Sequence, residues 1–324
     1  MAFTKENLKI DLASEAARIG ETMKRQLREL RRKGVVLGLS GGIDSSVTAA
    51  LAVKALGKER VFGIFMPEHD SDPETLRFSR MIAEHLGIET TLEDISPALE
   101  AVGCYRRRNE AVATVIPGFN PDWKFKIVLP GPDHAGLNFF SVVARSPEGL
   151  EVKERLPLHA YLTIVAATNF KQRIRKMLEY YYADSLNFAV AGTPNRLEYD
   201  QGFFVKQGDG SADVKPIAHL YKSQVYDMAE YLGVPEPIRR RPPTTDTYSM
   251  PQSQEEFYFA LPYDKMDLVL CGYNQGAPAA EIALAAGLTE AQVLHAFKDV
   301  ETKRSTTRYQ HLKPLLVEEI PNVG

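Results

Sequence analysis

The chain has 324 residues, of which 44% are hydrophobic and 25% charged, as in an ordinary globular enzyme of one large or two modest domains. Its net charge of −3 argues against a nucleic-acid substrate. Two isolated cysteines, Cys104 and Cys271, argue against a zinc site or a disulfide framework and suit a reducing cytoplasm. Residues 1–10 hold no apolar signal core, and no run of about 18 apolar residues follows, so we expect a cytoplasmic protein without a membrane segment.

Helix-like and strand-like segments alternate through much of the chain. Apolar residues at helical spacing predict an amphipathic helix over residues 12–30, and the apolar run 34–39 predicts a strand buried on both faces. The same reasoning predicts further helices at 46–56, 73–86, 97–113 and within 158–186, and further strands at 61–66, 88–92 and 187–192. This alternation predicts an α/β fold with a doubly wound parallel sheet.

Residues 115–157 interrupt the alternation with a segment rich in Pro, Gly and aromatic residues. Strand-like pieces occur at 123–129, 137–144 and 150–156, and a structureless loop of that length is unusual. We therefore interpret the segment as a β-rich insertion packed on the sheet of a single domain that spans residues 1–324. The part after it is predicted to be helical again, at 219–232, 263–271, 279–286 and 289–301.

A glycine- and serine-rich loop joins the first predicted strand to the next helix, and it consists of Gly38, Leu39, Ser40, Gly41, Gly42, Ile43, Asp44, Ser45 and Ser46. Adjacent glycines let the backbone approach a ligand closely, and the helix start presents free N–H groups. Hydroxyls add donors, and Asp44 among them suits a Mg²⁺ ion that bridges to phosphates. The loop matches neither G-x-x-x-x-G-K-[ST] nor G-x-G-x-x-G. A turn that merely starts a helix is the alternative, but the whole string favours binding of a polyphosphate.

With this loop the sequence resembles the N-type ATP pyrophosphatases, whose fold is adenine nucleotide alpha hydrolase-like and whose members adenylate an acid or amide oxygen. A second, ordered set of segments lies at 169–177, 191–198, 202–213, 215–225 and 241–246. It resembles the NAD synthetase family, with its GT-x-N-x-x-E, F-x-K-x-GDG-x-AD, YK-x-QV and PP-[ST]-x-D motifs. The match runs from the first strand to about Asp246.

The resemblance implies a ligase that forms NAD⁺ from nicotinic acid adenine dinucleotide, ATP and ammonia. An acyl adenylate forms with release of pyrophosphate, and ammonia then displaces AMP. By position, Asp44 and Glu198 resemble the family's Mg²⁺ ligands, and Lys222 resembles the lysine that contacts the ATP phosphates. Thr193 and Thr244 resemble hydroxyls that contact ATP.

Other positions resemble the family's second substrate site. Arg173, Lys206 and Asp213 correspond to dinucleotide-binding residues, and Lys303 lies in a segment that resembles the one closing over the substrate. Asp209 is a candidate for taking a proton from ammonium, with a structural turn over 208–210 as the alternative. For the charged residues the alternative is a solvated surface charge.

Several positions depart from the family pattern. The loop 67–72 lacks an Arg and a Gln that are usual there, Pro194 replaces an acid, and Thr302 stands where a His is common. Segment 244–259 also differs from the usual acidic loop, and the insertion is longer than in compact members. The departures in the loop 67–72 leave its adenine or phosphate contacts open, and two interpretations of the whole set stay open, a difference of lineage or a different acidic substrate.

The resemblance also bears on the nitrogen source and on assembly. Glutamine-dependent relatives carry an N-terminal amidase domain, whereas the phosphate loop here begins by residue 40, so we expect free ammonia as the donor. A separate glutaminase subunit stays an open alternative, and the resemblance implies a homodimer. Two other functions stay open at this point: another amide-forming or tRNA-modifying ATP pyrophosphatase, and a non-catalytic nucleotide-binding protein.

Overall fold

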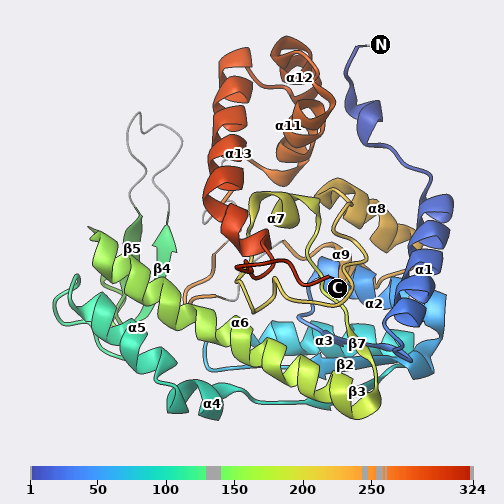
Figure 1. The fold of residues 1–324 in the computed structure, drawn as a ribbon. Helices are drawn as coiled ribbons and strands as arrows, with labels where there is room; N and C mark the ends of the chain where they lie inside the picture. Colours follow the sequence, from blue (N-terminus) through green and yellow to red (C-terminus); the bar gives the residue numbers. More distant parts are fainter. Residues whose placement is uncertain (1, 129–139, 243–246, 253–257, 260, 322–324) are drawn as a thin grey trace.

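The computed structural model describes residues 2–128, 140–242, 247–252, 258–259 and 261–321 (Figure 1). Its centre is a four-stranded sheet in the order β3-β2-β1-β7, with all neighbouring pairs parallel. The strands are β1 (Val35–Gly38), β2 (Val61–Phe65), β3 (Glu89–Leu92) and β7 (Ala189–Val190). The predicted α/β fold with a parallel sheet is confirmed.

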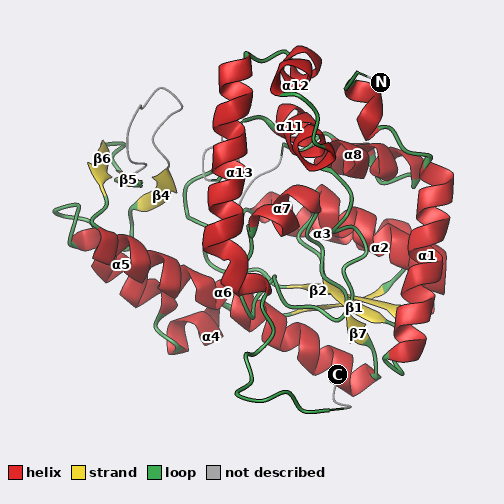
Figure 2. Cartoon of the chain, turned by 45° about the horizontal axis from the view of Figure 1, so that its top comes forward, coloured by secondary structure: helices red, strands yellow, loops and turns green. Residues whose placement is uncertain are grey.

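Helices cover both faces of this sheet (Figure 2). Val35 and Leu37 pack with the helices of one face, whereas Val36 between them packs with those of the other, as the alternation of a strand requires. The first face carries α1 (Leu12–Glu29), α2 (Ile43–Leu56), α3 (Pro73–Leu86), α8 (Lys222–Tyr231) and α9 (Glu236–Arg239); the second carries α4 (Ser96–Ala101), α5 (Cys104–Ala113) and α6 (Leu158–Leu186). Apolar strands buried on both sides therefore fix the layers.

The insertion forms a separate antiparallel sheet in the order β4-β5-β6, made of β4 (Lys124–Val128), β5 (Ser141–Arg145) and β6 (Glu151–Arg155). Its predicted β-rich character is confirmed, but the expectation that it packs on the parallel sheet is wrong. Phe125 and Ile127 of β4 bury against α5 and the first turns of α6 in a core of their own. The 29 residues of α6 extend over about 44 Å, so this helix reaches past the short parallel strands and offers the inserted sheet a surface.

Two element boundaries also differ from the prediction. The helix expected at 97–113 is divided into α4 and α5 by Gly103, whose φ of 70° ends a right-handed helix. The strand expected at 187–192 keeps only Ala189–Val190 in the ladder, with a further bridge from Ala191 to Val214. Both differences arise at backbone positions that apolar periodicity does not report.

The C-terminal helices form a third group that rises above the parallel sheet in Figure 1. These are α11 (Tyr263–Gln275), α12 (Ala279–Ala286) and α13 (Glu290–His311), as expected, although α13 continues ten residues past the predicted end at 301. Thr289 caps α13 through a reciprocal bond pattern with Gln292. The shorter elements are η1 (Lys5–Leu8), η2 (Lys58–Arg60) and α7 (Arg196–Gln201). None of the helices within the described ranges is long and apolar enough to cross a membrane.

Candidate active site

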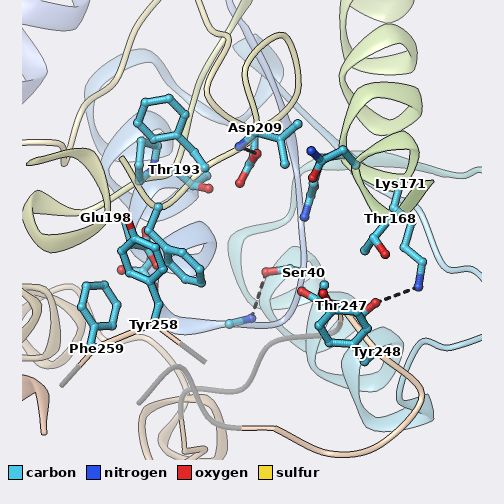
Figure 3. Close-up of a pocket in the computed structure, with 18 of the residues that line it drawn as sticks. Ser40, Thr168, Lys171, Thr193, Glu198, Asp209, Thr247, Tyr248, Tyr258 and Phe259 are labelled. Atoms are coloured by element: carbon cyan, nitrogen blue, oxygen red, sulfur yellow. Dashed lines mark hydrogen bonds between the residues drawn. The ribbon is translucent and has the colours of Figure 1, made fainter. Parts of the chain in front are cut away.

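A cavity of about 2220 Å³ opens at the carboxyl ends of the parallel strands. Its lining comes from the loops after β1, β2 and β7, from α6, α8 and α13, and from the inserted sheet (Figure 3). Pockets for one small ligand usually occupy roughly 300–1,000 Å³, so the cavity has room for more than one substrate. Its place agrees with the general position of sites in open α/β sheets.

The glycine- and serine-rich loop forms one wall of the cavity, which is lined by Gly38, Leu39, Ser40, Gly42, Ile43, Asp44 and Ser45. Gly41 does not line it, but its φ of 65° and the 2.6 Å that would separate an added Cβ from the Thr75 carbonyl leave space for glycine alone. Ser46 is fully buried, and its hydroxyl donates to the Gly42 carbonyl at 2.8 Å. The contacts of Gly41 and Ser46 thus fix the loop on the side away from the cavity, and the start of α2 faces the cavity.

Asp44, Lys222 and Glu198 lie together beside this loop, although 178 positions separate the first two in the chain. The Lys222 Nζ atom donates to Asp44 Oδ2, and Lys222 is only 2% exposed. Burial alone lowers the pKa of Lys222, but the Asp44 and Glu198 carboxylates outweigh it and leave the pKa above its usual value. Lys222 is therefore a permanent cation at the edge of the glycine- and serine-rich loop.

Asn195 joins the two carboxylates and has no assigned role in the sequence prediction. Its Nδ2 atom donates to Asp44 Oδ1 at 3.1 Å, and its Oδ1 atom accepts the Glu198 amide at 3.2 Å. Glu198 Oε2 in turn accepts the Asn195 amide at 3.2 Å, which completes a capping box on α7. The N-x-x-E spacing is a signal that identifies this residue, because a capping box requires that separation.

Asp267 of α11 fixes the helix that carries Lys222. Its carboxylate accepts the Lys222 amide at 3.2 Å and the Ser223 amide at 2.7 Å, at the N-terminus of α8. Burial raises the pKa of Asp267 to about 6, although the bonds from these two residues act against the rise. Sequence analysis does not find this residue, since the helix it caps is 45 positions away.

The residues predicted to bind the second substrate fall into two groups. Arg173, Lys206 and Lys303 line the cavity, and the Arg173 Nε atom donates to the Lys206 carbonyl at 3.3 Å. Lys303 donates to the Tyr258 carbonyl at 2.6 Å, and burial lowers its pKa despite the nearby Asp299. Asp213 instead accepts the Val190 amide at 2.7 Å beyond the end of β7 and does not line the cavity.

Asp209 and Thr193 both line the cavity, and Figure 3 shows Thr193 to the left of Asp209 and Lys171 to its right. Asp209 Oδ1 accepts the Val205 amide at 2.7 Å within the turn. Burial raises the pKa of Asp209, against the influence of the Val205 amide and of Lys176. Thr244 lies outside the described residues.

A buried ion pair on α6 also lines the cavity, and it was not predicted from the sequence. Lys176 Nζ and Glu179 Oε2 are 2.5 Å apart on α6, and both side chains are less than 10% exposed. The Glu179 carboxylate lies directly behind Gly38, where an added Cβ would be 3.0 Å from Oε1. A larger residue at position 38 would therefore require the Glu179 side chain to shift.

The loop after β2 forms a second charged cluster that depends on distant parts of the chain. Lys171 donates to Glu68 Oε1 at 2.9 Å and to Asp70 Oδ2 at 2.7 Å, and Arg108 also pairs with Asp70. The Tyr105 hydroxyl donates to Glu68 Oε2 at 2.8 Å. In this loop, where the family's usual Arg and Gln are absent, two acids are thus neutralised by cations from α5 and α6.

Comparison with known proteins identifies the family. A family model described as NAD synthase matches residues 15–115 and 151–311. The chain is 58% identical over 324 residues to an "NH(3)-dependent NAD(+) synthetase" of Rhizobium meliloti, covering all of this chain and 97% of that protein. The chain belongs to the NAD synthase family. This confirms the predicted class of enzyme, an ATP-using ligase of NAD⁺ biosynthesis, and disfavours the two alternative functions.

Solved structures support the fold of this NAD synthase family member. An NMN synthetase from Francisella tularensis superposes with a TM-score of 0.66 at 23% identity and covers 97% of this chain and 100% of that one. An NH3-dependent NAD synthetase from Campylobacter jejuni gives 0.63 at 22% identity, covering 96% and 100%. The expected adenine nucleotide alpha hydrolase-like fold is confirmed.

The donor set suits a magnesium ion that is held jointly with the nucleotide. Across the described ranges, no three or more His, Cys, Asp or Glu residues are grouped in a way that holds a metal. Mg²⁺ bound to nucleotides usually takes one or two protein carboxylates, with phosphate oxygens and waters as its other ligands. Asp44 and Glu198, which both act on Lys222, are compatible with such a site.

Proposed function

We propose that this chain joins ammonia to nicotinic acid adenine dinucleotide, with the Asp44–Lys222–Glu198 cluster at the ATP phosphates. The buried ion pair between Lys222 and Asp44, beside the first turn of α2, is the observation that carries the proposal. The N–H groups at the start of α2 and the Lys222 ammonium stabilise the negative charge that grows on the leaving pyrophosphate. A Mg²⁺ ion held by Asp44 and Glu198 would neutralise further phosphate charge when bound.

The nicotinate carboxylate attacks the α-phosphorus of ATP, and pyrophosphate leaves. This requires the acid to lie between the phosphate loop and the group formed by Arg173, Lys206 and Lys303. Those cations hold the acidic dinucleotide in place, since all three line the same cavity as Ser40 and Asp44. We also propose that Thr193 contacts ATP, since it lines the same cavity as Ser40 and Asp44.

We assign Asp209 to the second step, in which ammonia displaces AMP. Ammonium must lose a proton before it attacks the acyl carbon, and a carboxylate with a raised pKa is a better proton acceptor than an ordinary one. Asp209 meets this condition because burial raises its pKa at the cavity wall. Free ammonia is the proposed nitrogen source.

We also propose a homodimer formed across α6. Four large apolar side chains on the solvent side of this helix are exposed: Leu158 at 71%, Leu162 at 53%, Met177 at 62% and Tyr181 at 64%. Apolar stripes of this size on a soluble protein mark contact surfaces. Arg173 lies in the same exposed stripe of α6, so a dimer here places the dinucleotide near the interface.

The test mixes the purified protein with ATP, Mg²⁺, nicotinic acid adenine dinucleotide and either ammonium or glutamine, and measures NAD⁺, AMP and pyrophosphate. We expect all three products with ammonium and none with glutamine. Nicotinic acid mononucleotide serves as a competing acid, because a neighbour in fold is an NMN synthetase. Pyrophosphate release with the mononucleotide alone would reassign the acid, and absence of all products would refute the proposal.

A further inference from the structure

Two of the three strands of the inserted sheet lie in an internal gap of the family match. The match ends at residue 115 and resumes at 151, and both β4 and β5 fall within that gap. Nevertheless Lys126, Val128 and Val143 of this sheet line the cavity. A segment outside the shared family pattern therefore borders the site.

β4 is an edge strand, since β5 is its only neighbouring strand among the residues that the structure describes. An edge strand presents unpaired backbone groups on its free side. Here residues 249–252 occupy that side. The Phe125 amide donates to the Ser249 hydroxyl at 2.9 Å, and the Phe125 carbonyl accepts the Met250 amide at 3.1 Å. Further along the strand, the Gln252 side-chain amide donates to the Ile127 carbonyl.

Thr247 and Tyr248, the two residues before this contact, also contact other parts of the chain. Tyr248 is 3% exposed in the core of the inserted sheet, with its ring centroid 5.5 Å from that of Phe125. The Lys171 Nζ atom donates to the Thr247 carbonyl at 3.0 Å, which is the bond drawn beside Tyr248 in Figure 3. Thr247 and Tyr248 line the cavity together with Ser40 of the phosphate loop. Thr247 and Tyr248 are thus part of the cavity wall, and the residues that follow them, 249–252, anchor it on the insertion.

We propose that the inserted sheet, by binding residues 249–252, positions Thr247 and Tyr248 as a preformed wall for ATP and thereby sets the affinity for this nucleotide. The proposal rests on the proposed function for the identity of the nucleotide. A wall that is already ordered costs less to order when the ligand binds, so the anchoring bonds strengthen binding without touching the reacting atoms. Loss of the anchoring bonds should therefore change KM and the dissociation constant for ATP. In contrast, kcat depends on Asp44, Lys222 and Asp209.

The test removes the anchor and leaves the wall intact. Ser249→Ala deletes the acceptor of the Phe125 amide, Ser249→Thr keeps it, and Gln252→Ala deletes the bond to Ile127. We expect Ser249→Ala and Gln252→Ala each to raise KM for ATP about 5-fold, with kcat within about twofold of wild type. Ser249→Thr should restore the wild-type KM. Hydrogen exchange of the Met250 amide should be faster in both alanine variants, with the thermal midpoint changed little.

A matched control separates loosening of the wall from damage to the sheet. Glu154→Ala truncates an exposed side chain on β6, at the opposite edge of the same sheet from β4, and should leave KM for ATP unchanged. A second pair of variants, Lys126→Ala and Lys153→Ala, separates the effect of the anchoring bonds from that of the positive charge of the sheet. Lys126 and Lys153 both line the cavity in one cross-strand row with Val143, and Lys126 also donates to the Pro251 carbonyl at 3.4 Å.

An unchanged KM together with unchanged exchange of the Met250 amide in Ser249→Ala and Gln252→Ala would overturn the proposal. An equal rise in KM for Lys126→Ala and Lys153→Ala, with none for Ser249→Ala, would also overturn it and assign the effect to charge. Calorimetric titration with ATP alone gives the same comparison without the acid substrate. Hence failure of the wild-type protein to form NAD⁺ refutes the proposed function and leaves the anchoring test valid.

Discussion

The ammonium group of Lys222 lies against the carboxylate of Asp44, which joins the first residue of α8 to the second residue of α2. Both residues face the cavity, and the bond between them keeps each charge compensated while no nucleotide is bound. In the proposed function, phosphate oxygens that bind beside this pair would meet a cation that is already desolvated and fixed in position. Such a preorganised charge loses little free energy to reorganisation when negative charge develops.

Replacement of Lys222 by Met is expected to lower the rate of pyrophosphate release about 100-fold or more, since it removes a fixed cation from the phosphates. It also leaves Asp44 and Glu198 less compensated, so the thermal midpoint should fall. Pyrophosphate release is measured at saturating ATP, with circular dichroism to follow unfolding. Lys24→Met on the surface of α1 is the control and should keep both values. Full turnover in Lys222→Met would contradict the assignment.

Replacement of Gly41 by Ala is expected to destabilise the fold and to weaken ATP binding. The residue combines a φ of 65° with an added Cβ only 2.6 Å from the Thr75 carbonyl and 2.8 Å from the Phe78 Cβ atom. Gly233→Ala is the matched control, because Gly233 has a φ of 71° and open space around the added Cβ. The control should lose about 1 kcal/mol of unfolding free energy from backbone strain.

Gly41→Ala should lose clearly more than the Gly233→Ala control, since the phosphate loop must shift to admit the methyl group. Urea unfolding gives both free energies, and calorimetry gives the ATP affinity. Equal losses in the two variants would show that the loop tolerates the contact.

The features that could be predicted from the sequence are those fixed by neighbouring residues. Adjacent glycines after a buried apolar strand specify the phosphate loop because its geometry is local, and Gly41 has the left-handed backbone that such a loop needs. The N-x-x-E spacing of Asn195 and Glu198 likewise specifies a capping box within one helical turn.

The features that could not be predicted depend on partners far away in the chain. Lys171 meets Glu68 across 103 positions, and Asp267 meets the Lys222 amide across 45. The strand-like pieces within 115–157 indicated a β-rich insertion, but such local patterns carry no information on which surface the strands pack against. The prediction therefore had the inserted strands right and their packing partner wrong.

Asp267→Asn tests how α8 is held. The carboxyl pKa is raised to about 6 from a usual 3.8, so the native state binds a proton more readily than the unfolded chain between these values. Burial of the charged form thus opposes folding above about pH 6, and this cost disappears as the pH falls toward 4. The free energy of unfolding of wild type minus that of Asp267→Asn should therefore be larger at pH 4.5 than at pH 7.

In the same variant kcat should fall, because an NH2 donor replaces one of the two carboxylate oxygens that accept the Lys222 and Ser223 N–H groups, and the start of α8 shifts. Asp264→Asn, at an exposed position on the same helix, is the control and should show neither effect. A stability difference that is constant over this pH range would refute the titration of Asp267.

A charged residue introduced by substitution into the exposed apolar stripe of α6 is expected to dissociate the proposed homodimer. Met177→Glu places a carboxylate at the centre of an apolar contact, where desolvation without a partner costs several kcal/mol. Leu284→Glu on α12 is the matched control, since Leu284 is 87% exposed and lies on a different part of the molecule. Sedimentation velocity should give a monomer for Met177→Glu and a dimer for Leu284→Glu and for wild type.

Because Arg173 lies in the same stripe, KM for the dinucleotide should rise in the monomeric variant, whereas the dissociation constant of ATP should stay close to wild type. A dimer that persists in Met177→Glu would place the interface elsewhere, and a monomeric wild type would refute the assembly altogether.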